Sequence, residues 1–149
     1  MQFLLASALA VAAILQSFDR LELFVESAPN EANARIWVLA RREGAPEKVS
    51  LARGVLLDAS AIAAADVERG PGGYSQIRLS LTPEGARRLA EITRRFVGRR
   101  LGIVVEGRLR SAPRVMERVS NGILVIAGDF SDSEAQEMAR KLRPPAGLR

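Results

Sequence analysis

The chain of 149 residues contains no cysteine and no histidine. Their absence excludes disulfide bonds, thiol nucleophiles, imidazole bases and the usual zinc sites. Catalysis would have to use carboxylates, hydroxyls or lysines, but the sequence has neither a Gly-x-Ser-x-Gly motif nor a Ser-x-x-Lys pair. We therefore expect a protein that is not an enzyme and that uses no metal and no other cofactor.

Lysine is scarce as well, because Lys48 and Lys141 are the only two and every other cationic residue is an arginine. The 22 cationic residues exceed the 17 acidic ones, which gives a net charge of +5. Arginine pairs well with phosphate or carboxylate, so an acidic partner stays in consideration. The charges are spread along the chain and form no single block, which favours a basic surface that is simply solvated.

No hydrophobic run reaches the ~20 residues that a membrane-spanning helix needs. Residues 3–15 are nevertheless uncharged and resemble the apolar core of a secretory signal, with Ala8-Leu9-Ala10 as a cleavage-like triplet. We expect a signal peptide or an N-terminal apolar segment over residues 1–17 and one domain over 18–149. If residues 1–17 are such a segment, we expect the protein to be exported, and either periplasmic or associated with the membrane through this segment. The alternative is that these residues form the first helix of a cytosolic domain.

Short apolar or alternating runs, separated by turn residues, predict a protein rich in strands. The run 101–105 is almost entirely apolar, as in a strand that is covered on both faces. Glu106-Gly107 and Ser120-Asn121-Gly122 are turn signals, and Gly70-Pro71-Gly72-Gly73 is a turn that lacks the lysine of a phosphate loop. The strands we expect are 21–26, 35–41, 47–51, 77–81, 101–105, 108–111 and 123–127.

Three segments predict helices. Residues 59–67 are rich in alanine and follow a capping residue at Asp58 or Ser60, which predicts a short helix. A longer helix follows Thr82 as N-cap, with Pro83 at its first position and Gly98 as its stop. Its buried stripe is expected to be Ala86, Leu89, Ala90, Thr93, Phe96 and Val97. The last helix starts at Ser131, which forms a capping box with Glu134, and it ends before Pro144-Pro145. Together these elements predict an α+β fold, with a mostly antiparallel sheet and two main helices packed on it.

Acidic residues at two places are candidate sites. Asp129 and Asp132 could suggest a metal site or a glycosidase dyad, but the surrounding Ser131 and Glu134 are what a capped helix start requires. Glu106 lies at the end of a buried strand, where catalytic acids do occur, but its turn context favours an exposed hairpin residue.

Several short motifs follow one another in the second half of the chain. They are Glu84-Gly85-Ala86, then Thr93 and Gly98, the strand 101–105 with Glu106-Gly107, Ser111-Ala112-Pro113, Ile126-Ala127-Gly128, and Phe130-Ser131 followed by Glu134-Ala135. Their order resembles the head subdomain of the first periplasmic domain of SecD and SecDF. Glu106 and Leu89 depart from the family pattern, which has an aspartate and commonly an aromatic residue at these places.

The resemblance implies an exported, non-enzymatic domain that binds a polypeptide or a membrane-protein partner, with Sec translocon components as candidates, and that takes part in protein export. It covers neither the base subdomain nor the membrane helices of those proteins, so it implies nothing about proton coupling. The residues expected to shape the partner-binding surface are Gly107, Ser111, Ala112, Pro113, Gly128 and Phe130.

The alternative function is a basic module that binds anionic lipid or nucleic acid through an arginine-rich helix face. Aromatic residues form only 5% of the chain, and most lie on apolar stripes, so base stacking is disfavoured. A solvated helix face would also explain the arginines, which are Arg87, Arg88, Arg94, Arg95, Arg99 and Arg100.

Overall fold

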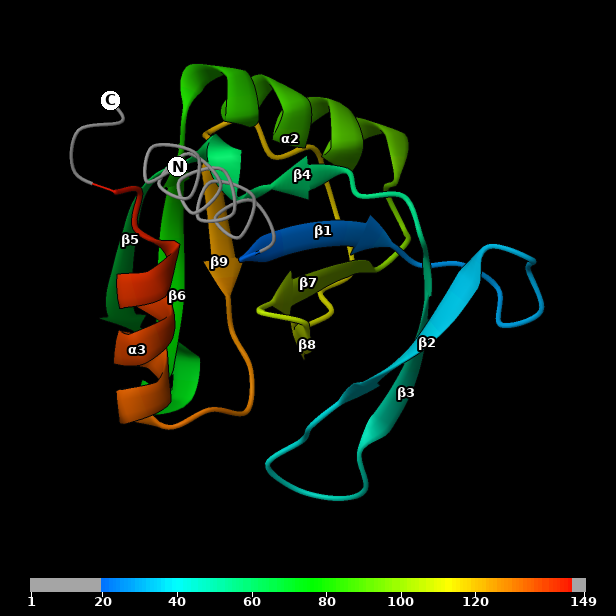
Figure 1. Ribbon diagram of the computed structural model, residues 1–149, viewed down its shortest axis with the longest axis horizontal. Helices are drawn as coiled ribbons and strands as arrows, with labels where there is room; N and C mark the ends of the chain where they lie inside the picture. The colour runs from blue at the N-terminus through cyan, green and yellow to red at the C-terminus, as the bar shows by residue number, and fades with distance from the viewer. Residues whose placement is uncertain (1–19, 146–149) are drawn as a thin grey trace, which may run out of the picture.

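The strands and helices of the computed structural model, which describes residues 20–145, are shown in Figure 1. The predicted signal segment, residues 1–17, lies outside the described residues. The α+β class is confirmed. The elements are β1 (Leu21–Val25), β2 (Ala34–Leu39), β3 (Glu47–Ala52), β4 (Leu57–Asp58), β5 (Ile62–Arg69), β6 (Ser75–Leu81), α2 (Pro83–Arg95), β7 (Leu101–Val105), β8 (Arg108–Ser111), β9 (Ile123–Ile126) and α3 (Asp132–Leu142), with 3-10 turns η1 (Ala59–Ala61) and η2 (Pro71–Gly73).

The strands form three separate antiparallel sheets where the sequence suggested one. The first sheet has the order β4-β1-β7-β8, the second pairs β2 with β3, and the third has the order β5-β6-β9. The apolar run 101–105 is the interior strand β7, bonded to β1 on one side and to β8 on the other. Its placement explains why all five of its residues are buried.

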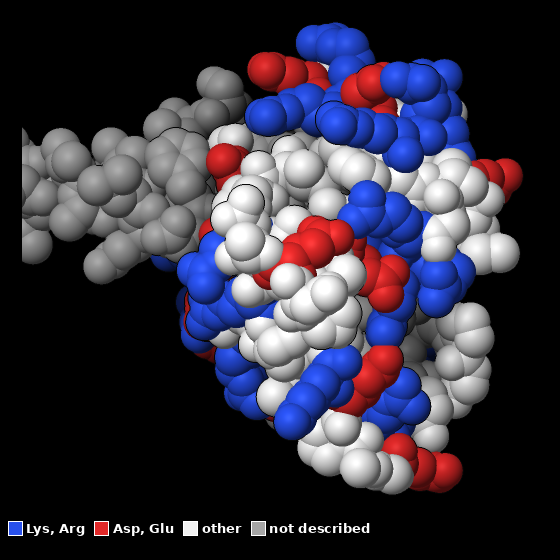
Figure 2. Space-filling view, turned by 90° about the vertical axis from the view of Figure 1, so that its right-hand side faces the viewer, with Lys and Arg blue, Asp and Glu red and all other residues white. Residues whose placement is uncertain are grey.

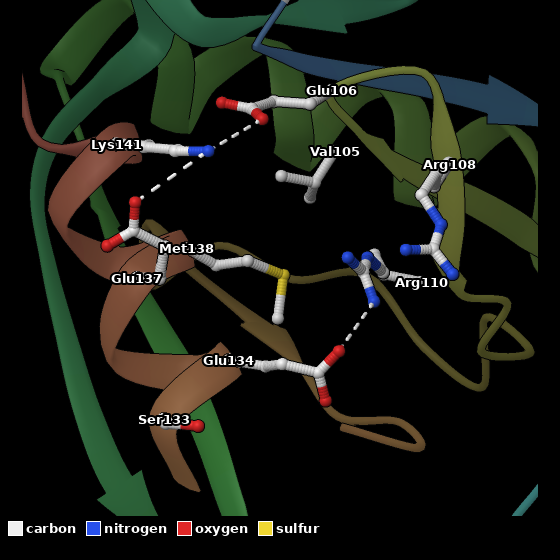
Figure 3. A pocket seen from close by; sticks show the side chains of 9 residues that line it. All are labelled: Val105, Glu106, Arg108, Arg110, Ser133, Glu134, Glu137, Met138 and Lys141. Atoms are coloured by element: carbon white, nitrogen blue, oxygen red, sulfur yellow. Dashed lines mark hydrogen bonds and ion pairs between the residues drawn. The ribbon is translucent and has the colours of Figure 1, made fainter. Parts of the chain in front are cut away.

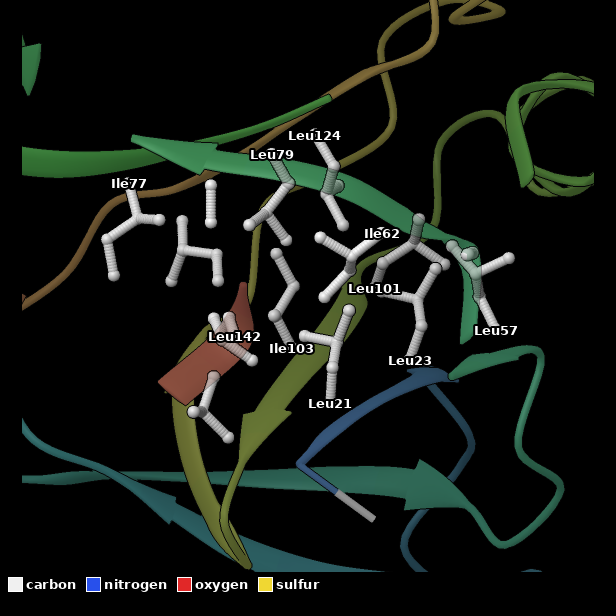
Figure 4. Close-up of a cluster of buried hydrophobic side chains, with 14 of the residues drawn as sticks. Leu21, Leu23, Leu57, Ile62, Ile77, Leu79, Leu101, Ile103, Leu124 and Leu142 are labelled. Carbon is white, nitrogen blue, oxygen red and sulfur yellow. The ribbon is translucent and has the colours of Figure 1, made fainter. Parts of the chain in front are cut away.

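The main core lies between the four-stranded sheet, the three-stranded sheet and the two helices. Side chains of β1 and β7 meet those of β6 and β9 there, and α3 closes it with Ala135, Met138 and Leu142. Figure 4 shows Leu21, Leu23, Ile103, Ile77 and Leu79 converging from these strands. Burial of so much aliphatic surface is the dominant stabilising contribution to the fold.

A second, smaller core lies on the opposite face of the four-stranded sheet, beneath the β2–β3 hairpin. It is built from Phe24, Val49, Leu51, Val104 and Leu109. Leu51 is fully buried, and its side chain rests where a Cβ on Gly102 would stand, within 2.2 Å. Glycine at position 102 therefore lets the hairpin approach β7 closely.

Both main helices begin as the sequence indicates, and α3 ends before Pro144-Pro145, but α2 ends at Arg95, before the predicted stop at Gly98. The Thr82 hydroxyl accepts a hydrogen bond from the Gly85 N–H at 3.0 Å, and Gly98 has a φ of 88°, the left-handed conformation of a helix stop. At the start of α3, Ser131 and Glu134 form the predicted capping box. The expected α2 stripe is right in part: Leu89, Ala90 and Thr93 are buried, while Ala86 and Phe96 are half-buried. Val97 lies beyond the last turn and is 52% exposed.

The predicted helix over residues 59–67 is wrong. Only η1 is helical there, capped by the Asp58 side chain, and the chain continues as β5. Pairing with β6 from Ile62 to Arg69 supplies inter-strand hydrogen bonds, and it places Ile62 and Ala65 in the core. The helix preference of alanine is only a few tenths of a kcal/mol per residue, so this tertiary pairing prevails. The predicted turn at 70–73 joins the two strands, with Gly72 and Gly73 at positive φ.

Candidate functional site

Four of the predicted surface residues lie along the β7–β8 hairpin and the segment after it. Gly107 forms the turn with Glu106, and both have positive φ, as a tight two-residue hairpin turn requires. Ser111 ends β8 and is buried, and Ala112 packs against the second core. Pro113 is exposed, and its carbonyl accepts a hydrogen bond from the Leu101 N–H at 2.9 Å. These residues build the hairpin, and a contact role for them stays a prediction.

The other two predicted surface residues, Gly128 and Phe130, lie in the connection between β9 and α3. Gly128 lies against the Arg110 carbonyl of β8, so close that a Cβ would stand 2.3 Å from its oxygen. Phe130 is 3% exposed and packs in the main core. Its ring is therefore not a surface contact, and its place in the predicted binding surface has to be corrected to a packing role.

The arginine face is only partly assembled as predicted. Arg87, Arg88, Arg94 and Arg95 are exposed on α2, and Figure 2 shows cationic side chains crowding the upper edge of the molecule, where α2 lies in Figure 1. Arg99 lies near this face, 5.3 Å from the centroid of the Phe96 ring.

Arg100 does not belong to the arginine face. Its guanidinium pairs with Glu47 of β3, and its side chain is only 19% exposed. Glu47 is also paired with Arg41, so one carboxylate lies between two guanidinium groups at the loop end of the β2–β3 hairpin, where Leu39 pairs with Glu47. Hydrogen bonds from Arg100 and then Arg41 lower the pKa of Glu47 to about 2, against an ordinary value of 4.5.

We expect this cluster to make stability depend on acid pH. Because the folded pKa of Glu47 is depressed, its contribution is complete above pH 4.5 and is lost as the pH falls toward about 2. The Glu47 side chain is still a quarter exposed, so solvent screens its ion pairs. The free energy of unfolding should therefore fall by about 1–2 kcal/mol over this pH range. Urea unfolding between pH 2 and pH 7 measures it. Glu47→Gln should lack this part of the pH dependence, and an unchanged dependence in the variant would contradict the assignment.

A pocket of about 440 Å³ opens between the β7–β8 hairpin and α3. Figure 3 shows that Glu106 and Lys141 face each other across it, and Lys141 Nζ lies 3.1 Å from Glu106 Oε2 and 3.8 Å from Glu137 Oε1. At the other end of the pocket, Arg110 of β8 lies 4.0 Å from Glu134 of α3. Of the residues around the pocket, the sequence singled out Glu106 and the capping residue Glu134. The cations come from elements that no local pattern brings together.

The electrostatics of this pocket do not favour acid–base chemistry. A general acid near neutral pH needs a carboxyl with a raised pKa. The pKa of Glu134 is instead lowered by its backbone hydrogen bond to Ser131, and that of Glu137 is lowered by its hydrogen bond to Arg140. Within residues 20–145 there is also no group of three or more acidic residues arranged to hold a metal ion.

The β2–β3 hairpin presents an apolar surface that sequence reasoning missed. Ile36 and Val38 of β2 are 49% and 59% exposed, although both are large aliphatic residues in a strand. Trp37, between them, turns the other way and stacks on Phe24, with ring centroids 5.9 Å apart. Side chains alternate between the two faces of a strand, so the sequence 34–39 could have indicated that Ile36 and Val38 share one face. It could not indicate which face of the strand would be covered by the rest of the protein.

The tip of this hairpin is fastened to the rest of the molecule by Arg42. Its Nη2 donates hydrogen bonds to the carbonyls of Gly128 and Phe130 at 3.3 and 3.1 Å. The guanidinium also lies 3.8 Å from the centroid of the Tyr74 ring. The loop end of the hairpin is thus held by two residues, Arg42 in the loop and Glu47 at the start of β3.

No helix within the described part of the chain is long and apolar enough to cross a membrane. This finding concerns residues 20–145 alone.

Several known proteins are similar to this chain in sequence and come from one family. The family model for the SecDF P1 head subdomain matches residues 35–146. The protein translocase subunit SecDF of Thermus thermophilus is 44% identical over 71 residues, which are 48% of this chain and 10% of that protein. The protein translocase subunit SecD of Dictyoglomus turgidum is 37% identical over 91 residues, 61% of this chain and 23% of that protein.

Solved structures agree with these sequence matches. A structure of SecDF, described as a membrane component that enhances protein export, has a TM-score of 0.67 and 26% identity over 92% of this chain and 68% of that chain. SecDF in a super-membrane-facing form has a TM-score of 0.67 and 27% identity over 89% of this chain and 20% of that chain.

The chain spans only about a tenth to a quarter of the length of these curated relatives. The family model, in contrast, matches well over half of the chain, and it includes the hairpins and both helices described above. This chain belongs to the SecDF P1 head subdomain family.

Proposed function

We propose that this domain takes part in protein export by binding an extended segment of an exported polypeptide on the periplasmic side of the membrane. The relatives are named protein translocase subunits, and one related structure is described as a component that enhances protein export. These names support a role in protein export. The structure of the β2–β3 hairpin supports the binding of a polypeptide as the domain's part in that role.

The single observation that carries the proposal is the open edge of β2. Within residues 20–145, β2 is hydrogen-bonded as a strand only to β3, so one row of its backbone N–H and C=O groups has no strand partner. Natural sheets usually protect such an edge with charges, proline or a covering element. On β2, Ile36 and Val38 are exposed, and Arg35 is the single charged residue of the strand.

An unpaired edge of this kind can bind an extended chain by adding it as a further strand. Backbone hydrogen bonds then supply affinity that does not depend on the ligand sequence, and neighbouring apolar side chains bury part of the ligand. A protein that handles many different unfolded chains requires such tolerance. The Arg42 and Glu47 contacts hold the hairpin in place beforehand, which lowers the entropic cost of binding.

The test is binding of a permanently unfolded polypeptide, such as reduced and carboxymethylated α-lactalbumin, followed by fluorescence anisotropy. The double variant Ile36→Lys/Val38→Lys removes two apolar contacts and places charge on the edge, so affinity should fall about tenfold or more. The matched control is Val97→Lys/Met116→Lys, since these residues are also exposed, by 52% and 78%, on a different surface. Equal losses in both variants would contradict the proposal.

A component of the Sec translocon is the second partner that the relatives' names support, and we propose it on that basis. The comparisons give no support to the alternative of a module that binds anionic lipid or nucleic acid. The exposed arginines of α2 therefore keep the simpler interpretation of a solvated helix face, with Arg94 paired to Glu91 on the same helix.

A further inference from the structure

Arg110 in the pocket between β8 and α3 is a cation without adequate partners. Its side chain is 16% exposed, and its Nε is buried with no hydrogen-bond partner. Its one ion pair among residues 20–145, with Glu134, is 4.0 Å long, beyond hydrogen-bonding distance. Glu134 is already engaged, because its Oε2 accepts the Ser131 N–H at 2.8 Å in the capping box.

The surroundings of Arg110 increase this imbalance. Arg108 projects from the same face of β8 two residues earlier, and Figure 3 shows the two side chains side by side on one wall of the pocket. Burial first, and the charge of Arg108 second, lower the pKa of Arg110. A buried guanidinium that lacks hydrogen bonds is costly, and a ligand that satisfies it would remove that cost.

We propose that the pocket binds a single carboxylate carried by a peptide, with Arg110 and Arg108 as its recognition residues. A carboxylate matches the planar fork of arginine and accepts two parallel hydrogen bonds. The side chains of Val105 and Met138 form an apolar floor for the residue that carries it. The carboxylate could be the free C-terminus of a chain or the side chain of Asp or Glu, and the two sources share the same chemistry.

The acidic residues of the pocket limit the ligand to one negative charge. Glu106, Glu134 and Glu137 all line it, and they would repel a doubly charged phosphate more strongly than a carboxylate. Lys141 on the far wall is already paired with Glu106 and Glu137, so it adds little net attraction. The site therefore differs from a general phosphate site.

The experiment is an NMR titration of the whole chain, followed at the backbone amide signals of β8 (Arg108–Ser111) in every variant and, where Arg110 is present, also at its Nε–H signal. The probes are acetyl-Ala-Leu, its C-terminal amide, acetyl-Ala-Glu-amide and inorganic phosphate. We expect saturable shifts with at least one acid-bearing peptide, which binds tenfold or more tightly than the Ala-Leu amide and phosphate. Whichever acid binds better identifies the source of the carboxylate. Equal binding of the amide or of phosphate would overturn the proposal.

Variants distinguish a loss of carboxylate binding from a loss of folding and from a loss of polypeptide binding at the β2 edge. Arg110→Met should weaken the acid-bearing peptide at least tenfold and leave the urea midpoint unchanged or higher, because an underpaired buried charge is removed. Arg108→Met, at an exposed position, should weaken it about threefold and serves if Arg110→Met does not fold. Arg87→Met removes the same charge on α2 and should change nothing. Ile36→Lys/Val38→Lys should also leave this binding intact, so the two sites fail independently.

Discussion

Gly128→Ala is expected to lower the free energy of unfolding by about 2–3 kcal/mol, although it adds only one methyl group. The added Cβ would stand 2.3 Å from the Arg110 carbonyl oxygen, which is backbone and cannot rotate away as a side chain could. Either β8 or the segment that enters α3 must therefore shift. Urea unfolding of the variant and the parent protein measures the difference.

The matched control is Gly54→Ala. A Cβ at Gly54 would meet nothing within 4 Å, and its φ is not in the left-handed region. That substitution should be neutral or should stabilise the protein by a few tenths of a kcal/mol, because alanine restricts the unfolded chain. If the two substitutions changed the free energy of unfolding by similar amounts, the close approach of Gly128 to β8 would not explain the need for glycine at position 128.

Leu51→Ala is expected to cost about 3–4 kcal/mol, the largest effect of a single side-chain truncation that we predict for the β2–β3 hairpin. Leu51 is fully buried between the hairpin and the bare backbone of Gly102, so its removal leaves a cavity beneath the hairpin. The hairpin would also be held less firmly, and affinity for an unfolded polypeptide should fall along with stability.

Val38→Ala, on the exposed face of the same hairpin, is the comparison for Leu51→Ala. Val38 is 59% exposed, so its truncation should change stability by less than about 0.5 kcal/mol. Unfolding in urea measures the stability of both variants. If both lost the same small amount of unfolding free energy, the second core would not be holding the hairpin in place.

Local chemistry was predictable from the sequence. The Thr82 cap, the Ser131–Glu134 capping box and the Glu106-Gly107 turn depend on residues within a few positions of each other, and the structure confirms all three. The order of turns and caps also indicated the family, because a family pattern is largely a pattern of such local constraints. The α+β class followed from the same elements.

Features that depend on long-range pairing were not predictable. The alanine-rich stretch after Asp58 became β5 because β6 pairs with it, and the pairing outweighs a weak helix preference. Arg100 was assigned to the arginine face by its sequence neighbours, yet it pairs with Glu47, which is 53 positions away. The carboxylate pocket joins β8 to α3, and no periodicity in either segment reveals the other.

The most direct measurement of the central claim, that the open edge of β2 binds an extended polypeptide, is amide hydrogen exchange with and without the unfolded polypeptide. We predict that the β2 amides over 35–39 that do not bond to β3 exchange at least several-fold more slowly in the complex. Protection confined to α2 or to the 113–119 segment, with β2 unchanged, would contradict the account.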